Sequence, residues 1–157
     1  MRRWGYAVGL TGLFVLLGGF AVGRWTRIRY VSLPAPVRAP IRLAVLGDFH
    51  IIDEASMHHA RACIERAMRA HPDMILLVGD YVHTHRGLPY LPRALQGVQA
   101  PLGVYAVLGN HDHWSGTESV VRALQASGVR VLREENLTVR KGATALTLVG
   151  VHDLWCR

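Results

Sequence analysis

The chain has 157 residues, half of them hydrophobic, and a formal net charge of +7, a length that fits one ordinary domain. The excess charge lies entirely in residues 1–42, which carry seven arginines and no acid, whereas residues 43–157 are formally neutral. This placement argues against a basic nucleic-acid-binding domain, so we expect no nucleic-acid partner. Cys63 and Cys156 occur in no CxxC or Cys-His pattern, which argues against a disulfide framework or a zinc ribbon.

Residues 4–23 form an uncharged run of twenty residues, long enough as a helix to span about 30 Å of hydrocarbon. We predict one transmembrane helix, with residues 1–29 as the anchor and its basic flanks. The alternative is a cleaved signal peptide, but the run exceeds the usual core of about 7 to 15 residues. More arginines follow the run than precede it, which predicts a cytoplasmic globular part. The proline-rich residues 30–40 are predicted to be a stiff linker whose arginines contact anionic headgroups.

Short β-like runs alternate with helical patterns after the linker. We predict strands at 41–46, 74–78 and 103–108, helices at 55–70 and 117–127, a weak helix before the third strand, and further strands at 129–132 and 146–151. Asp53 or Ser56 is predicted to cap the first helix, and Ser115-Gly116-Thr117-Glu118 reads as a capping box for the second. This alternation is typical of an α/β sheet covered by helices.

Polar residues follow each of the first three predicted strands. A glycine followed by Asp or Asn at one strand end is usually just a turn. Side chains that follow neighbouring strands of an open α/β sheet, however, converge at the carboxyl edge where ligands bind. The three blocks are Gly47-Asp48-Phe49-His50, Gly79-Asp80 and Gly109-Asn110-His111-Asp112. Their joint occurrence predicts a functional site.

In this order the blocks resemble the first signature blocks of the calcineurin-like metallophosphoesterases, and the likeness covers about residues 41–155. The chain is most similar to the small bacterial membrane-associated branch of that family. The resemblance implies a four-layer αββα sandwich, of which residues 41–157 would supply a C-terminally incomplete, N-terminal part. It also implies hydrolysis of a small phosphate ester, a phosphodiester or a pyrophosphate that is in some relatives lipid-linked, at a bacterial inner membrane.

The resemblance also implies a role for each polar residue. Asp48 and His50 would bind a first metal, Asp80 would bridge two metals, and Asn110 would bind the second. His111 would contact the phosphate and protonate the leaving oxygen. Two divalent ions, Mn, Fe or Zn, suit this set of carboxylate and imidazole ligands and can activate water near neutral pH.

The chain departs from the family pattern in two respects. Members carry three further metal-binding histidines, one alone and two in a Gly-His-x-His block, whereas here only His152 follows His113. Val82-His83-Thr84-His85 is not expected to replace that block, because it directly follows Asp80 in the chain; His83 and His85 are predicted to be loop residues. The phosphatase branch has an Asp and an Arg after its Gly-Asp block, and both are absent here. A phosphoprotein substrate is therefore not expected, and Asp112 is left as one candidate partner for His111.

These departures leave the enzymatic status open. One interpretation is a truncated enzyme that binds Mn weakly and turns over poorly by itself. The alternatives are a non-catalytic remnant that serves as an interaction module, and a secreted enzyme. With most of the second sheet missing, one face of the first sheet is expected to be exposed. Trp114 is expected either at the mouth of the site or in the core.

Overall fold

The computed structural model describes residues 26–151, so the predicted membrane anchor lies outside the part described. Within that part, no helix is both long and apolar enough to cross a membrane. Residues 26–32 belong to one compact unit and have no regular secondary structure, and the unit that starts at Leu33 holds every helix and strand of the described range. The end of the predicted linker is part of this second unit, because the Ala39 N–H donates to Thr144 Oγ1 at 2.9 Å.

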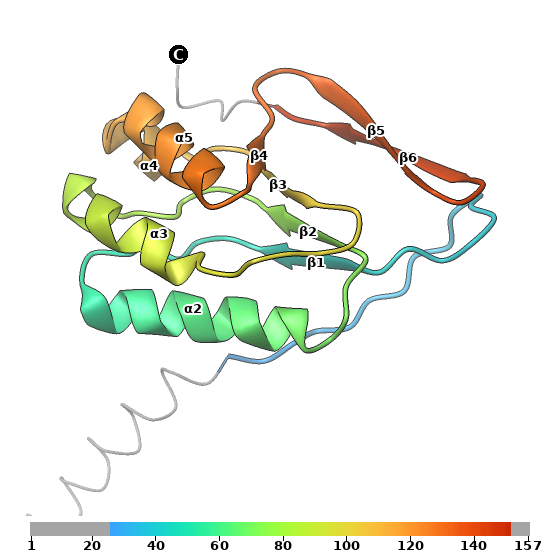
Figure 1. Ribbon diagram of the computed structural model, residues 1–157, viewed down its shortest axis with the longest axis horizontal. Coiled ribbons are helices and arrows are strands. Elements are labelled where there is room, and N and C mark those ends of the chain that lie inside the picture. Colours follow the sequence, from blue (N-terminus) through green and yellow to red (C-terminus); the bar gives the residue numbers. More distant parts are fainter. Residues whose placement is uncertain (1–25, 152–157) are drawn as a thin grey trace, which may run out of the picture. The chain divides into compact units, whose positions relative to one another are not determined.

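The core of the second unit is a parallel sheet with strand order β1-β2-β3-β4 (Figure 1). All neighbouring pairs are parallel; Leu43 lies opposite Met74, and Ile75 lies opposite Val104. The strands are β1 (Leu43–Leu46), β2 (Met74–Leu77), β3 (Val104–Ala106) and β4 (Arg130–Val131). The predicted α/β class is confirmed, and each of these strands is shorter than its predicted range.

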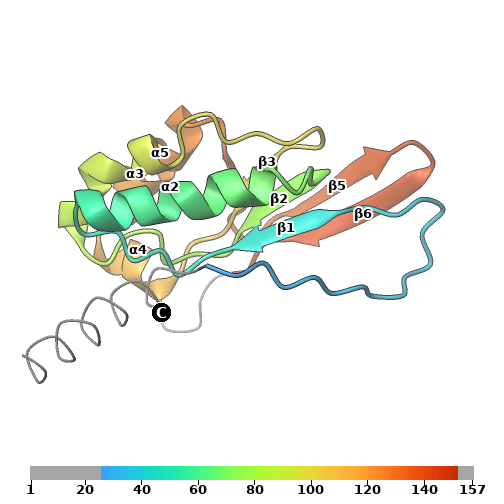
Figure 2. The same ribbon diagram turned by 90° about the horizontal axis from the view of Figure 1, so that it is seen from below.

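Helices cover one face of this sheet (Figure 2). They are α2 (Glu54–Met68), α3 (Leu91–Ala94), which follows the 3₁₀ helix η1 (His85–Tyr90), and α5 (Thr117–Ala126). Ile64, Leu91 and Leu124 are fully buried in the core that these helices form with the sheet.

Of the two helix caps that the sequence predicted, one is confirmed and the other is wrong. Asp53 caps α2 as expected, since its carboxylate accepts the Ser56 N–H at 2.8 Å. The capping box predicted for α5 is wrong, because its N-cap residue is Gly116, with φ 108° and no side-chain bond. The short helix α4 (Asn110–Trp114), which was not predicted, precedes α5.

A hairpin of β5 (Asn136–Lys141) and β6 (Thr144–Val149) follows β4. The two strands are antiparallel, and Leu137 pairs with Leu148 on the half-buried side. The first strand was not predicted, and the second starts earlier than the predicted range. Near the turn, Lys141 Nζ lies 2.7 Å from the Asp73 carboxylate, and this contact fastens the hairpin to the start of β2.

The sheet face opposite the helices is apolar. Side chains alternate between the faces of a strand, and in β1 Ala44 and Leu46 pack on the core. Leu43 and Val45 therefore face the other way, and they are 41% and 60% exposed. Val78, just after β2, is 50% exposed. Among residues 26–151, this face is thus exposed in part, whereas Met74, which lies opposite Leu43, is fully buried.

Candidate metal centre at the strand ends

The loops after β1 and β2 remain hydrogen-bonded to each other beyond the strands. The backbone bonds run from Asp48 N–H to Gly79 O (3.1 Å), from His50 N–H to Asp80 O (3.0 Å), from Ile51 N–H to Tyr81 O (3.0 Å) and from His83 N–H to Ile51 O (3.1 Å). A parallel bridge between Ile51 and Val82 continues the same pairing. This ladder places the side chains of the two loops side by side.

The backbone at these positions is held in an uncommon conformation. Asp48, His50 and Asp80 have φ values of 54°, 45° and 57°, in the left-handed region that non-glycine residues seldom adopt. Such conformations persist only where the surroundings enforce them, and they cluster at functional sites. Their concentration in two adjoining loops indicates a functional site at the strand ends.

Two glycines allow the ends of β2 and β3 to approach closely. Gly79 has φ 97°, and a methyl group on it would lie 2.5 Å from the Gly109 nitrogen. A methyl group on Gly109 would lie 2.7 Å from the Asp80 nitrogen. The glycines that precede Asp80 and Asn110 in the sequence pattern are therefore required by backbone contact.

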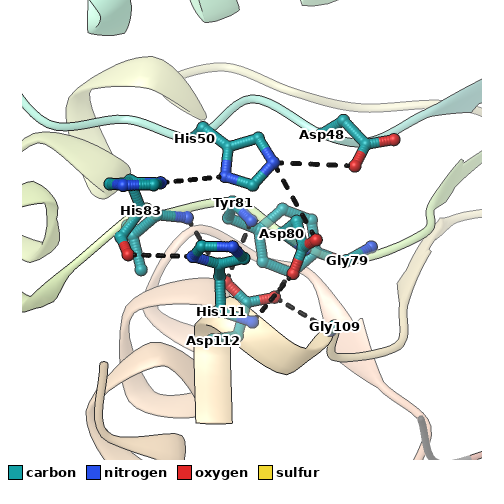
Figure 3. A network of polar contacts seen from close by, with 10 residues as sticks. Asp48, His50, Gly79, Asp80, Tyr81, His83, Gly109, His111 and Asp112 are labelled. Carbon is teal, nitrogen blue, oxygen red and sulfur yellow. Dashed lines mark hydrogen bonds and ion pairs between the residues drawn. The ribbon is translucent and has the colours of Figure 1, made fainter. Parts of the chain in front are cut away.

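Asp48, His50 and Asp80 form a cluster that could hold a cation (Figure 3). One ligand atom from each lies within 4.8 Å of the others. His50 Nε2 is 3.7 Å from Asp48 Oδ1 and 3.9 Å from Asp80 Oδ2, too far for direct hydrogen bonds. Two carboxylates and one imidazole nitrogen suit Mn, Fe or Zn. The donor set fits the predicted first metal.

A second group of side chains, His50, His83 and His111, shares His50 with the first. His111 Nδ1 lies 3.1 Å from the His83 carbonyl oxygen, and because a carbonyl only accepts, this nitrogen carries the proton. The His83 ring stacks on the His111 ring, with 4.7 Å between the ring centroids and an angle of 25° between the ring planes. His83 does lie in a loop, as predicted, but the structure brings this loop into the site.

Trp114 contacts the site from α4. Its ring centroid is 4.9 Å from that of His111, and the residue is 66% exposed. Of the two places expected for Trp114, the structure favours the mouth of the site over the core. His85 was also predicted to be a loop residue, but it is the first residue of η1, and it is exposed.

Asp112 is fully buried, and it links the loop after β2 to the loop after β3. Its carboxylate accepts backbone N–H bonds from Asp80 (2.8 Å), Tyr81 (2.9 Å), Gly109 (3.0 Å) and Val82 (3.3 Å). Burial raises the pKa of this carboxyl to about 6, and the backbone bonds offset part of that rise. The expectation that Asp112 could be the partner of His111 is wrong, because His111 Nδ1 contacts the His83 carbonyl oxygen instead.

Replacing Asp112 by Ala should destabilise the fold by about 2–4 kcal/mol, because it leaves several buried N–H groups without an acceptor. Asp112→Asn keeps one oxygen and should fall between wild type and Asp112→Ala. Urea unfolding of the metal-free proteins measures the difference. An Ala variant as stable as the Asn variant would contradict the proposed dependence of these two loops on the Asp112 carboxylate.

Asn110 is the first residue of α4 and lies between two residues that touch Asp80. The His111 N–H donates to Asp80 Oδ1 at 3.0 Å, and Gly109 approaches the Asp80 backbone as described above. Asn110 is half-buried, and its role as a ligand of a second metal stays a prediction. His152 lies outside the described residues.

The chain is similar to known proteins over most of the second unit. Residues 41–153 match the family model of the calcineurin-like phosphoesterases. A metallophosphoesterase from Aquifex aeolicus is 36% identical over 75% of this chain and 44% of its own length. The phosphodiesterase YaeI of Escherichia coli is 31% identical over 74% and 45%, and the metallophosphoesterase YkoQ of Bacillus subtilis is 27% identical over 75% and 45%. The chain thus spans less than half the length of these relatives. The match over residues 41–153, together with the signature blocks at the strand ends, shows that the chain belongs to the calcineurin-like phosphoesterase family.

Proposed function

We propose that this chain carries the first half of the active site of a metal-dependent phosphoesterase. The observation that supports this most strongly is that ligand atoms of Asp48, His50 and Asp80 lie within 4.8 Å of one another at the ends of two strands. The family to which the chain belongs gives this cluster its meaning. A phosphodiester or a pyrophosphate is the substrate class we propose, and the E. coli relative is named a phosphodiesterase. A lipid-linked substrate is a narrower proposal that depends on the predicted membrane anchor.

Each side chain has a defined task in this proposal. Asp48, His50 and Asp80 would hold one divalent cation, and Asp80 with Asn110 would contribute to a second. When bound, these cations would supply the positive charge that activates water and stabilises the phosphoryl group in its transition state. Asp80 also fixes the start of α4, because its Oδ1 accepts the His111 N–H.

His111 would deliver a proton to the leaving oxygen. Its Nδ1–H is held by the His83 carbonyl, so Nε2 is the free nitrogen. In the imidazolium form, in which Nε2 also carries a proton, the Nε2–H would protonate the leaving oxygen and leave a neutral imidazole. Contact with the Trp114 and His83 rings restricts the orientation of the imidazole. Positioned general acids of this kind contribute about 10²- to 10⁴-fold to a rate.

Hydrolysis of bis(p-nitrophenyl) phosphate with added Mn²⁺ tests the proposal. It is measured on the longest natural form of the protein that carries this chain, because the relatives are more than twice as long as the matched region. We expect turnover that EDTA abolishes and Mn²⁺ restores. Turnover that EDTA leaves unchanged would contradict the proposal. No turnover at all, despite bound metal, would favour the non-catalytic interaction module instead.

A further inference from the structure

His83 is the one histidine of the site for which the family pattern has no assigned role. Its ring is exposed and lies in the loop that continues from Asp80. The backbone bond from the His83 N–H to Ile51 O holds it opposite the loop of His50. As a result, His83 Nδ1 lies 3.4 Å from His50 Nδ1, and a dashed line marks this contact in Figure 3.

The two nitrogens of His50 face different partners. Nε2 faces the carboxylates of Asp48 and Asp80, and Nδ1 faces His83. A neutral imidazole has one N–H and one lone pair, and only the lone pair can bind a cation. For Nε2 to bind a cation beside the carboxylates, Nδ1 must carry the proton and needs an acceptor.

We propose that His83 is a positioning residue, whose Nδ1 lone pair accepts the Nδ1–H of His50 and thereby holds the His50 Nε2 lone pair toward the metal. The inference rests on the metal site of the proposed function. Metal-binding histidines commonly donate their other N–H to an acceptor, and loss of that acceptor typically costs about 10- to 100-fold in metal affinity. Here an imidazole takes the place more often filled by a carboxylate or a carbonyl.

Direct binding of a metal by His83 together with His111 fits the geometry less well. A nitrogen lone pair lies in the plane of its ring, and the rings of His83 and His111 are stacked within 25° of parallel at 4.7 Å. Lone pairs in stacked rings run side by side rather than toward one ion. His111 Nδ1 is also already bonded to the His83 carbonyl.

A matched pair of variants isolates the acceptor of His83. His83→Asn places an amide oxygen near the position of Nδ1, whereas His83→Leu has a similar size and no acceptor. The His83 carbonyl that holds His111 belongs to the backbone and remains in both. Co²⁺ binding to the 157-residue chain is followed by its visible absorption, and urea unfolding without metal shows whether each variant is folded.

We expect the Leu variant to bind Co²⁺ about 10- to 100-fold more weakly than wild type, and the Asn variant to keep most of the affinity. In metal-free protein at a pH where imidazole is neutral, ¹⁵N NMR should find the proton of His50 on Nδ1 in wild type and His83→Asn, and shifted toward Nε2 in His83→Leu. A purely structural role for His83 would leave this tautomer unchanged.

Other results would overturn the inference in distinguishable ways. Equal affinity in wild type and both variants would remove any role of the His83 ring. Equal loss in both variants, with one fewer nitrogen ligand on the bound Co²⁺, would make His83 a direct ligand. Co²⁺ binding that is unchanged by Asp80→Asn would instead refute the metal site of the proposed function, whatever the His83 variants show.

Discussion

Replacing Asp80 by Asn is expected to weaken binding of Mn²⁺ or Co²⁺ by about 100-fold or more. This loss of affinity is larger than the loss that follows removal of a residue that only hydrogen-bonds to a metal ligand. Asp80 Oδ2 faces His50 Nε2 at 3.9 Å, and its side chain is only 16% exposed. Asn is nearly the same size, and its amide oxygen can still accept the His111 N–H. The substitution therefore removes the negative charge and leaves the surrounding loops in place.

Asp73→Asn is the matched control, because Asp73 stands directly before β2, at the opposite end of the strand from Asp80. It removes the same charge from a carboxylate that contacts Lys141 and Arg42 and lies outside the histidine site. Calorimetry and metal analysis after gel filtration report affinity and content. If the two variants bind metal equally well, Asp80 is not a ligand.

The strand-end pattern predicted the location of the site because of how parallel sheets are built. Apolar runs that end in Gly-Asp or Gly-Asn put polar side chains at one edge, and Asp48, His50 and Asp80 do lie together there. The residue types alone also indicated the class of ligand, since carboxylates with imidazole suit divalent metals. The individual metal-binding and catalytic roles remain predictions.

The position of His83 could not be predicted from its distance along the chain. It was expected to be a loop residue that does not replace the missing Gly-His-x-His block, because it follows Asp80 so closely. The loop instead continues the strand pairing, through the bonds of His50 and Ile51 to Asp80 and Tyr81. A signal was present in the sequence, because Tyr81 and Val82 are of types that favour extended backbone.

The role of Asp112 depends on tertiary structure in a similar way. Nothing local to Asp112 indicates that its carboxylate accepts bonds from Asp80, Tyr81 and Val82, which are about thirty residues away. The β5 strand was missed for a related reason. Its polar residues, Thr138 and Arg140 among them, face outward, and the strand is formed by pairing with β6.

Replacing His111 by Asn should lower the hydrolysis of an unactivated alkyl phosphodiester by about 10²- to 10⁴-fold, and that of a p-nitrophenyl ester by less than about tenfold. An alkoxide needs a proton as it leaves, whereas nitrophenolate departs readily without one. His111 Nε2 is the nitrogen available for this transfer, since Nδ1 is bonded to the His83 carbonyl. Asp80→Asn, by contrast, should lose activity on both esters, because it removes metal.

The assay compares both esters with wild type, His111→Asn, Asp80→Asn and the control His58→Asn, and metal content is measured in parallel. His58 lies on the exposed side of α2, 65% accessible in its side chain, and its loss should change neither rate. Equal losses by His111→Asn on the two esters, with metal retained, would show that His111 does not protonate the leaving group. Loss of metal from His111→Asn would instead make His111 a metal ligand beside Asp48, His50 and Asp80.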